Sequence, residues 1–222
     1  MANIYIRSAV HGPQKGPTYI IEPVPQRFEK LSKLERIKNN PDFHLFSDYV
    51  AGTEEGSAIL NLADHVPELA SLYNFSEEIF LSCPERAKDW KFTGTRDVKK
   101  IRLDNFIDQH NISRVDHLDI RGCQGNNFDV LKSLGDKIDI VYAGVAKSNW
   151  LSSIYDDPEN EHTVHIAKLL NDHGFDVIVE ADQVRLPASY SGIPRPVMLR
   201  GRWHYVEGLE ATIKFSKKHK TE

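Results

Sequence analysis

The chain has 222 residues, a net charge of −4 and a pI near 6.2, with 27% charged and 40% hydrophobic residues. This is the composition of a folded protein long enough to bury a sizeable core, and it excludes a largely disordered chain. It also argues against a dedicated nucleic-acid binder, because such proteins usually carry a strong basic excess.

Cysteine usage and hydropathy narrow the class of protein further. Cys83 and Cys123 are the two cysteines, which gives neither a disulfide framework nor a metal-ligand spacing. No segment approaches the roughly 18–20 apolar residues of a membrane span, and the first fifteen residues contain no apolar signal-peptide core. We therefore predict a cytoplasmic protein that binds neither a metal nor a membrane. The basic tail, residues 216–222, is expected to be a solvated end.

The N-terminal half contains a strand, a helix and two further strands. The predicted strand Tyr19–Ile21 ends on the carboxylate Glu22, and a Pro-Val-Pro turn follows. A helix is then predicted from an apolar residue at every third position, ending at Asn39-Asn40-Pro41. The repeating residues are Phe28, Leu31, Leu34 and Ile37. Strands are predicted at Phe43–Val50 and Ser57–Leu62, and residues 63–97 leave loop, short helix and strand open.

In the C-terminal half, apolar strands alternate with helical patterns. The predicted helices are 103–110, 128–134 and 163–172, the predicted strands are 115–120, 138–145, 175–179 and 209–215, and residues 185–203 are a predicted loop. Gly135 and Gly174 end the last two helices. This alternation predicts an α/β fold, with a mostly parallel sheet covered on both faces. We expect one domain over residues 1–222.

Glu22 is the first candidate binding residue. It follows a short apolar strand, and the carboxyl ends of parallel strands are where open α/β sheets bind nucleotide-type ligands. A carboxylate there can accept hydrogen bonds from the two hydroxyls of a ribose.

The segment Ile101–Leu134 resembles the FkbM-type methyltransferases. It contains a Leu-Asp-Asn-Phe helix start at 103–106, a strand with Leu-Asp-Ile at 118–120, Gln-Gly at 124–125 and Val-Leu at 130–131. Three earlier segments also resemble that family in the same order: Ile21–Pro25, the strand and turn Val50–Gly56, and Ala70–Tyr73. Together these matches cover about residues 17–180.

The resemblance implies a class I methyltransferase-like (Rossmann-like) fold, with a mostly parallel sheet and a C-terminal antiparallel hairpin. It implies an S-adenosylmethionine-dependent O-methyltransferase that acts on the hydroxyl of a small molecule or glycan. Glu22 would bind the ribose, Asp48 would lie near the adenine, and Gln124 and Gly125 would shape the floor beside the methyl group. The candidate catalytic residues are Asp119, Arg121 and Gln124.

The N-terminus departs from the family. No glycine-rich loop precedes Glu22, although class I methyltransferases carry one after their first strand. The connector His11–Pro17 is shorter than the dozen or more residues of a parallel crossover. We therefore expect that Asn3–Val10 is not the family's first strand with its normal helix behind it. The first βα unit is either lost or rebuilt, and the short Gly-Pro-Gln-Lys-Gly connection would suit a hairpin.

Two further departures bear on activity. Arg121 stands where the family has an acid, which would reverse the charge facing a cationic sulfonium, and Ile140–Lys147 lacks the carboxylate often found at the end of that strand. The alternative function is therefore a catalytically inactive, methyltransferase-derived binding or scaffold domain. A homodimer, in which a second copy supplies the missing loop, stays open.

Overall fold

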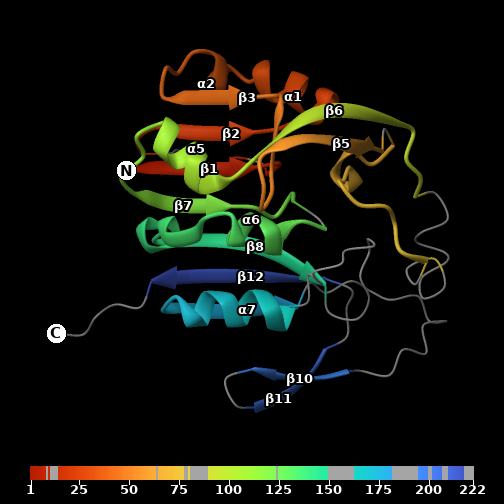
Figure 1. Ribbon diagram of the computed structural model, residues 1–222, viewed down its shortest axis with the longest axis vertical. Helices are drawn as coiled ribbons and strands as arrows, with labels where there is room; N and C mark the ends of the chain where they lie inside the picture. Colours follow the sequence, from red (N-terminus) through yellow and green to blue (C-terminus); the bar gives the residue numbers. More distant parts are fainter. Residues whose placement is uncertain are drawn as a thin grey trace.

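The computed structural model describes residues 1–8, 10, 15–63, 65–77, 80, 90–123, 125–149, 163–181, 195–199, 202–206 and 210–217. Its main sheet has seven strands in the order β3-β2-β1-β7-β8-β12-β9 (Figure 1). Their bounds are β1 Ala2–Ile6, β2 Thr18–Ile21, β3 Phe43–Phe46, β7 Val115–Asp119, β8 Ala143–Asn149, β9 Phe175–Ala181 and β12 Glu210–Lys217.

The strand directions confirm the predicted class I methyltransferase-like fold. β3, β2, β1, β7 and β8 are parallel to one another, and β12 is antiparallel to both β8 and β9. The sheet is thus mostly parallel, with antiparallel strands contributed by the C-terminal part of the chain. Because β1, β2 and β7 are adjacent and parallel, their carboxyl ends meet at one edge, which is where this class of sheet binds ligands.

The hairpin expected at the N-terminus was wrong, because β1 and β2 are parallel. β1 is a central strand, parallel to β2 with Asn3 opposite Thr18, so it occupies the first-strand position and forms no hairpin. All five of its residues are buried, as expected for a parallel strand covered on both faces. The described part of the connector 7–17 contains no helix, and Asn3 holds its end by donating from its backbone N–H to Pro17 (2.9 Å). A hairpin was expected because the connector is shorter than the usual parallel crossover.

A second, three-stranded sheet lies beside the carboxyl edge. Its order is β4-β6-β5, with bounds β4 Tyr49–Ala51, β5 Gly56–Leu62 and β6 Gly94–Ile101. The strand predicted at 43–50 is therefore two strands in two sheets, because the chain turns at Ser47-Asp48. Glu22 pairs with the last residue of β3, whereas Lys99 of β6 pairs with Asp48. β6 begins in the range 63–97 that the sequence left open, and it continues to Ile101.

The predicted helices are largely confirmed, with changed ends. Their bounds are α1 Pro25–Ser32, α2 Glu35–Lys38, α5 Leu103–Gln109, α6 Asn127–Lys132 and α7 Thr163–Asp172, with 3-10 helices η1 Pro67–Leu69 and η2 Gly135–Ile140. The first predicted helix is broken in two, because Leu34 is extended (φ −70°, ψ 121°). α7 ends at Asp172, and Gly174 follows it with a φ of +76°, which suits glycine.

Two predictions for the C-terminal half were partly wrong. The strand expected at 138–145 begins at Ala143, because Gly135–Ile140 forms the 3-10 helix η2. The loop expected at 185–203 contains β10 Arg195–Leu199 and overlaps β11 Arg202–Val206, which pair as an antiparallel hairpin. The many proline, glycine and arginine residues in this range suggested a loop. Val197–Leu199 and Trp203–Val206 nevertheless supply strand-forming residues.

Helices cover the sheet on both faces near β1 and β2. Ile4 and Ile6 of β1 pack with Phe106 of α5 in the largest core, and Tyr5 points to the opposite face with Ile37 of α2. Farther along the sheet, α7 packs on β8, β9 and β12 (Figure 1). Within the described ranges, no helix is both long and apolar enough to cross a membrane.

Gly144 of β8 provides a test of this packing. A Cβ atom there would lie 2.4 Å from the Leu118 carbonyl oxygen and 2.3 Å from the Phe215 ring, so the neighbouring strands leave no room. We expect Gly144→Ala to lower the free energy of unfolding by about 1–3 kcal/mol, measured by chemical denaturation. The matched control is Gly94→Ala in β6, where a Cβ meets nothing within 4 Å. Equal stability of the two variants would contradict this sheet order.

Candidate functional site

Three charged side chains stand at the carboxyl edge of the central strands. Arg7 follows β1, Glu22 follows β2, and Asp119 is the last residue of β7. All three are buried, with exposed fractions of 6%, 0% and 1%. Because burying a charge without a partner is costly, the contacts of each one decide what this edge can bind.

Glu22 is held by the start of the next helix. Its Oε1 accepts a hydrogen bond from the backbone N–H of Val24 (3.1 Å), and its Oε2 accepts one from Arg27 Nε (2.7 Å). Because residues 23 and 25 are prolines, Val24 has the only backbone N–H among these three residues. Pro25 starts α1, which places Arg27 in the first turn of that helix. The local sequence thus turns the helix start back onto the carboxylate.

Arg27 connects Glu22 to the end of β1. Its Nη2 donates to the backbone carbonyl of Arg7 (2.8 Å), and its Nη1 pairs with Glu68 Oε1 (2.9 Å). Two acids, Glu22 and Glu68, therefore share one guanidinium across three segments of the chain. The Glu22–Arg27 pair is the buried part of this network, because the Glu68 carboxylate is 58% exposed.

Arg7 has the least satisfied buried charge at this edge. Its φ is +53°, and its guanidinium makes one hydrogen bond, from Nη2 to the Glu68 carbonyl (3.2 Å), whereas the buried Nε has no partner in the described part of the chain. Gly122 packs directly on its backbone: a Cβ there would lie 1.7 Å from the Arg7 carbonyl oxygen. A glycine is therefore required at 122 for β1 and the loop after β7 to approach.

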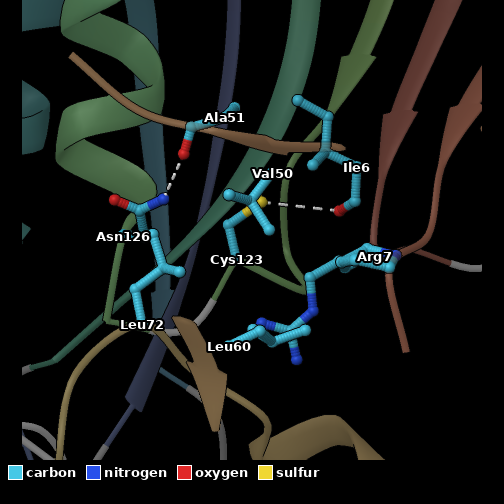
Figure 2. Close-up of a pocket in the computed structure, with 9 residues that line it drawn as sticks. Ile6, Arg7, Val50, Ala51, Leu60, Leu72, Cys123 and Asn126 are labelled. Carbon is cyan, nitrogen blue, oxygen red and sulfur yellow. Dashed lines mark hydrogen bonds between the residues drawn. The ribbon is translucent and has the colours of Figure 1, made fainter. Parts of the chain in front are cut away.

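A small cavity of about 10 Å³ lies beside Arg7. Figure 2 shows most of the side chains around it. They are Ile6, Arg7, Pro23, Val50, Ala51, Leu60, Leu72, Cys123 and Asn126. A space of this size holds about one water molecule.

Asp119 and Arg121 form a closed pair. Asp119 accepts hydrogen bonds from Ser8 Oγ (2.7 Å), Arg121 Nε (3.0 Å) and the Arg121 backbone N–H (3.2 Å), and its Oδ2 lies 2.6 Å from Arg121 Nη2. Burial lowers the pKa of the neighbouring His117 and raises that of the Tyr5 hydroxyl, so both are neutral at neutral pH. Arg121 therefore neutralises Asp119, and it does not add a net positive charge to this edge.

The remaining predicted site residues lie around this centre. Asp48 is exposed and follows β3, where it pairs with Arg96 of β6 (2.9 Å), and Arg96 also donates to the Pro23 carbonyl beside Glu22 (2.6 Å). Gly125 has a φ of +77° in the turn before α6. Gln124 lies outside the described residues. The edge thus brings Glu22, Asp119, Arg121 and Asp48 to the ends of adjacent strands.

Sequence reasoning did not identify Arg7, Arg27 or Asn126. Arg27 could have been found, because its position in the first turn after Pro25 directs it toward a carboxylate five residues earlier. The position of Arg7 depends on the pairing of β1, which was predicted wrongly. Asn126 precedes α6 and donates from Nδ2 to the Ala51 carbonyl, a contact between distant segments that no local pattern indicates.

A profile of the family described as Methyltransferase FkbM domain matches residues 5–177, which is more than half of the chain. The chain belongs to the FkbM methyltransferase family. The match begins within β1 and ends within β9, so it spans the edge just described.

Two other comparisons accompany the FkbM assignment. The solved structure of the precorrin 8W decarboxylase of Methanobacterium thermoautotrophicum is 12% identical, with a TM-score of 0.36, and the similarity covers 91% of this chain and 70% of that one. A comparison with curated proteins gives no match.

Methyltransferase families generally use S-adenosylmethionine. The carboxyl edge of this sheet has some of the polar groups that could bind this cofactor. Glu22 is a buried acceptor directly after β2, and Arg7 and Asn126 each carry a buried polar atom without a partner in the described residues. The free volume does not match that of a cofactor site. A small-molecule site usually measures about 300–1,000 Å³, whereas the cavity beside Arg7 measures about 10 Å³. The polar groups at this edge fit the cofactor, whereas the free volume beside Arg7 does not.

The buried Glu22–Arg27 pair predicts an asymmetric mutational effect. Arg27→Met leaves the Glu22 carboxylate buried without its cation, so we expect the free energy of unfolding to fall by about 3 kcal/mol in chemical denaturation. The matched control is Lys33→Met at the end of the same helix, which breaks an exposed pair with Glu29 and is expected to cost about 0.5 kcal/mol or less. A cost for Arg27→Met no larger than that of the control would contradict the buried pair.

Proposed function

We propose that the chain is an S-adenosylmethionine-dependent O-methyltransferase that acts on the hydroxyl of a small molecule or glycan. The observation that supports it most is Glu22, a fully buried carboxylate directly after β2, in a sheet of the class I order and in a chain of the FkbM family. A buried acid at this position is costly unless it binds donors, and ribose hydroxyls are donors.

Each residue of the edge has a defined task in this proposal. Glu22 accepts the two ribose hydroxyls after Arg27 turns away, and Asp48 lies on the side of β3, toward the adenine. Asp119 and Arg121 stay paired and position the segment that continues into Gln124 and Gly125, the floor beside the methyl group. The cofactor supplies an electrophilic methyl group on a sulfonium, so the chain mainly has to hold an oxygen in line with it.

Opening of the edge is a local change in this proposal. Two arginine side chains stand at this edge, and both contact Glu68: Arg7 binds its backbone carbonyl and Arg27 binds its carboxylate. The Glu68 side chain is largely exposed. Arg27 can turn toward Glu68 and solvent without moving a strand. Because the Glu22–Arg27 contact is lost in that step, its cost reduces the apparent affinity for the cofactor.

One observation favours a second function. Both Glu22 oxygens already have partners, and the cavity beside Arg7 is about the size of one water molecule, as in a domain that has lost its cofactor. The alternative is therefore a catalytically inactive, methyltransferase-derived binding or scaffold domain. Cofactor binding distinguishes the two functions.

Isothermal titration with S-adenosylmethionine and S-adenosylhomocysteine tests the proposal. We expect micromolar binding by the wild-type chain, weakened at least about tenfold by Glu22→Gln, which keeps the side-chain size and removes the charge. The control is Glu29→Gln in the following helix α1, an exposed acid paired with Lys33, which should bind as the wild type does. Circular dichroism establishes that each variant is folded.

Two results would contradict the enzyme. Absence of binding at millimolar ligand by a folded wild-type chain favours the scaffold domain. Equal binding by the wild type and Glu22→Gln places the ligand elsewhere. Binding that depends on Glu22 leads to a screen of acceptor hydroxyls.

A further inference from the structure

A second, larger hollow lies next to the carboxyl edge. It has a volume of about 480 Å³, within the usual range of small-molecule sites, and opens between β5, β6 and the start of α6. We call it the polar hollow, after the polar side chains that line it. These are Thr53, Ser57, Tyr73, Lys100, Asn126 and Asp129.

Asn126 gives the polar hollow an unsatisfied acceptor. The residue is 8% exposed, and its Nδ2 donates to the Ala51 carbonyl, whereas its Oδ1 is buried and has no partner in the described part of the chain. Figure 2 shows the amide nitrogen turned toward Ala51 and the oxygen turned away from Cys123. An unpaired buried acceptor is costly, so this oxygen is suited to a ligand that donates a hydrogen bond.

The two charges in the polar hollow balance. Asp129 accepts a hydrogen bond from the Tyr73 hydroxyl on Oδ2 (2.8 Å), which leaves Oδ1 as an acceptor. The Lys100 ammonium forms no ion pair with any described residue, and its aliphatic part lies over Gly52, where a Cβ would come within 2.7 Å of Lys100 Cδ. A cationic ligand would face Lys100 and an anionic one Asp129, so the pair favours a neutral ligand.

The ligand must also donate and accept at many points. Asn126 and Asp129 are acceptors, Lys100 is a donor, and the Ser57 and Thr53 hydroxyls are both. A hydroxyl group also does both, so a ring carrying several hydroxyls matches this wall. Ala58, Ile59 and Leu72 add apolar surface, and Ile59 is 60% exposed, which suits the C–H face of such a ring.

We propose that the polar hollow binds a neutral saccharide. Asn126 and Leu72 line both the polar hollow and the small cavity beside Arg7, so a bound sugar lies next to the cofactor position. That the saccharide is the methyl acceptor rests on the proposed function, whereas its binding does not.

Saturation-transfer NMR with methyl glycosides of glucose, galactose, mannose and rhamnose tests the proposal. We expect at least one neutral glycoside to bind, and glucuronic acid and glucosamine to bind more weakly. Lys100→Met and Asp129→Asn should each weaken the binding about tenfold, because each removes a hydrogen bond to a charged group. The matched control is Lys99→Met, the exposed neighbour on the other face of β6, which should leave the affinity unchanged.

The outcomes separate this inference from the proposed function, because S-adenosylhomocysteine is titrated in parallel. One outcome is that a saccharide binds and needs Lys100 and Asp129, whereas S-adenosylhomocysteine does not bind. This outcome supports a saccharide site in the polar hollow and contradicts the proposal that the saccharide is the methyl acceptor. Binding of S-adenosylhomocysteine with no saccharide bound by the folded chain overturns the inference alone. Saccharide binding weakened equally by Lys99→Met, or stronger binding of a charged sugar, also overturns it.

Discussion

The buried ion pair between Glu22 and Arg27 is the interaction on which the carboxyl edge depends. It fixes the start of α1 against β2, and through the Arg7 carbonyl and Glu68 it ties β1 to the segment after β5. A buried pair contributes little net stability but is costly to break on one side. In the proposed function this pair therefore closes the cofactor position, and it keeps there Glu22, the buried acid that cofactor binding would use.

The sequence predicted the elements whose signals are local. The strand before Glu22, the helices at Leu103 and Thr163, and Gly174 after the second of them follow from apolar spacing and caps, and the FkbM resemblance supplied the sheet class. The parallel pairing of β1 could not be predicted, because a parallel crossover usually takes a dozen or more residues and the pairing is non-local. The break at Ser47-Asp48 and the β10–β11 hairpin likewise depend on partners far along the chain.

The same division applies to the site. Glu22 was predictable from its place after a strand, and the structure puts it at the edge expected for it. The effect of Arg121 was not predictable from its type, because a charge change matters only with its partner, and Arg121 folds back onto Asp119. The polar hollow arises from segments more than forty residues apart, such as Tyr73 with Asp129. The partners of Glu22, in contrast, are Val24 and Arg27, which are close to it in the sequence.

We propose that Glu22 exchanges Arg27 for the cofactor ribose. A crystal structure of the chain grown with millimolar S-adenosylhomocysteine tests it most directly. The prediction is a nucleoside at the ends of β1 and β2, with its ribose hydroxyls on Glu22 and Arg27 turned toward Glu68. Crystals in which Arg27 still holds Glu22 and the edge contains no nucleoside would contradict it.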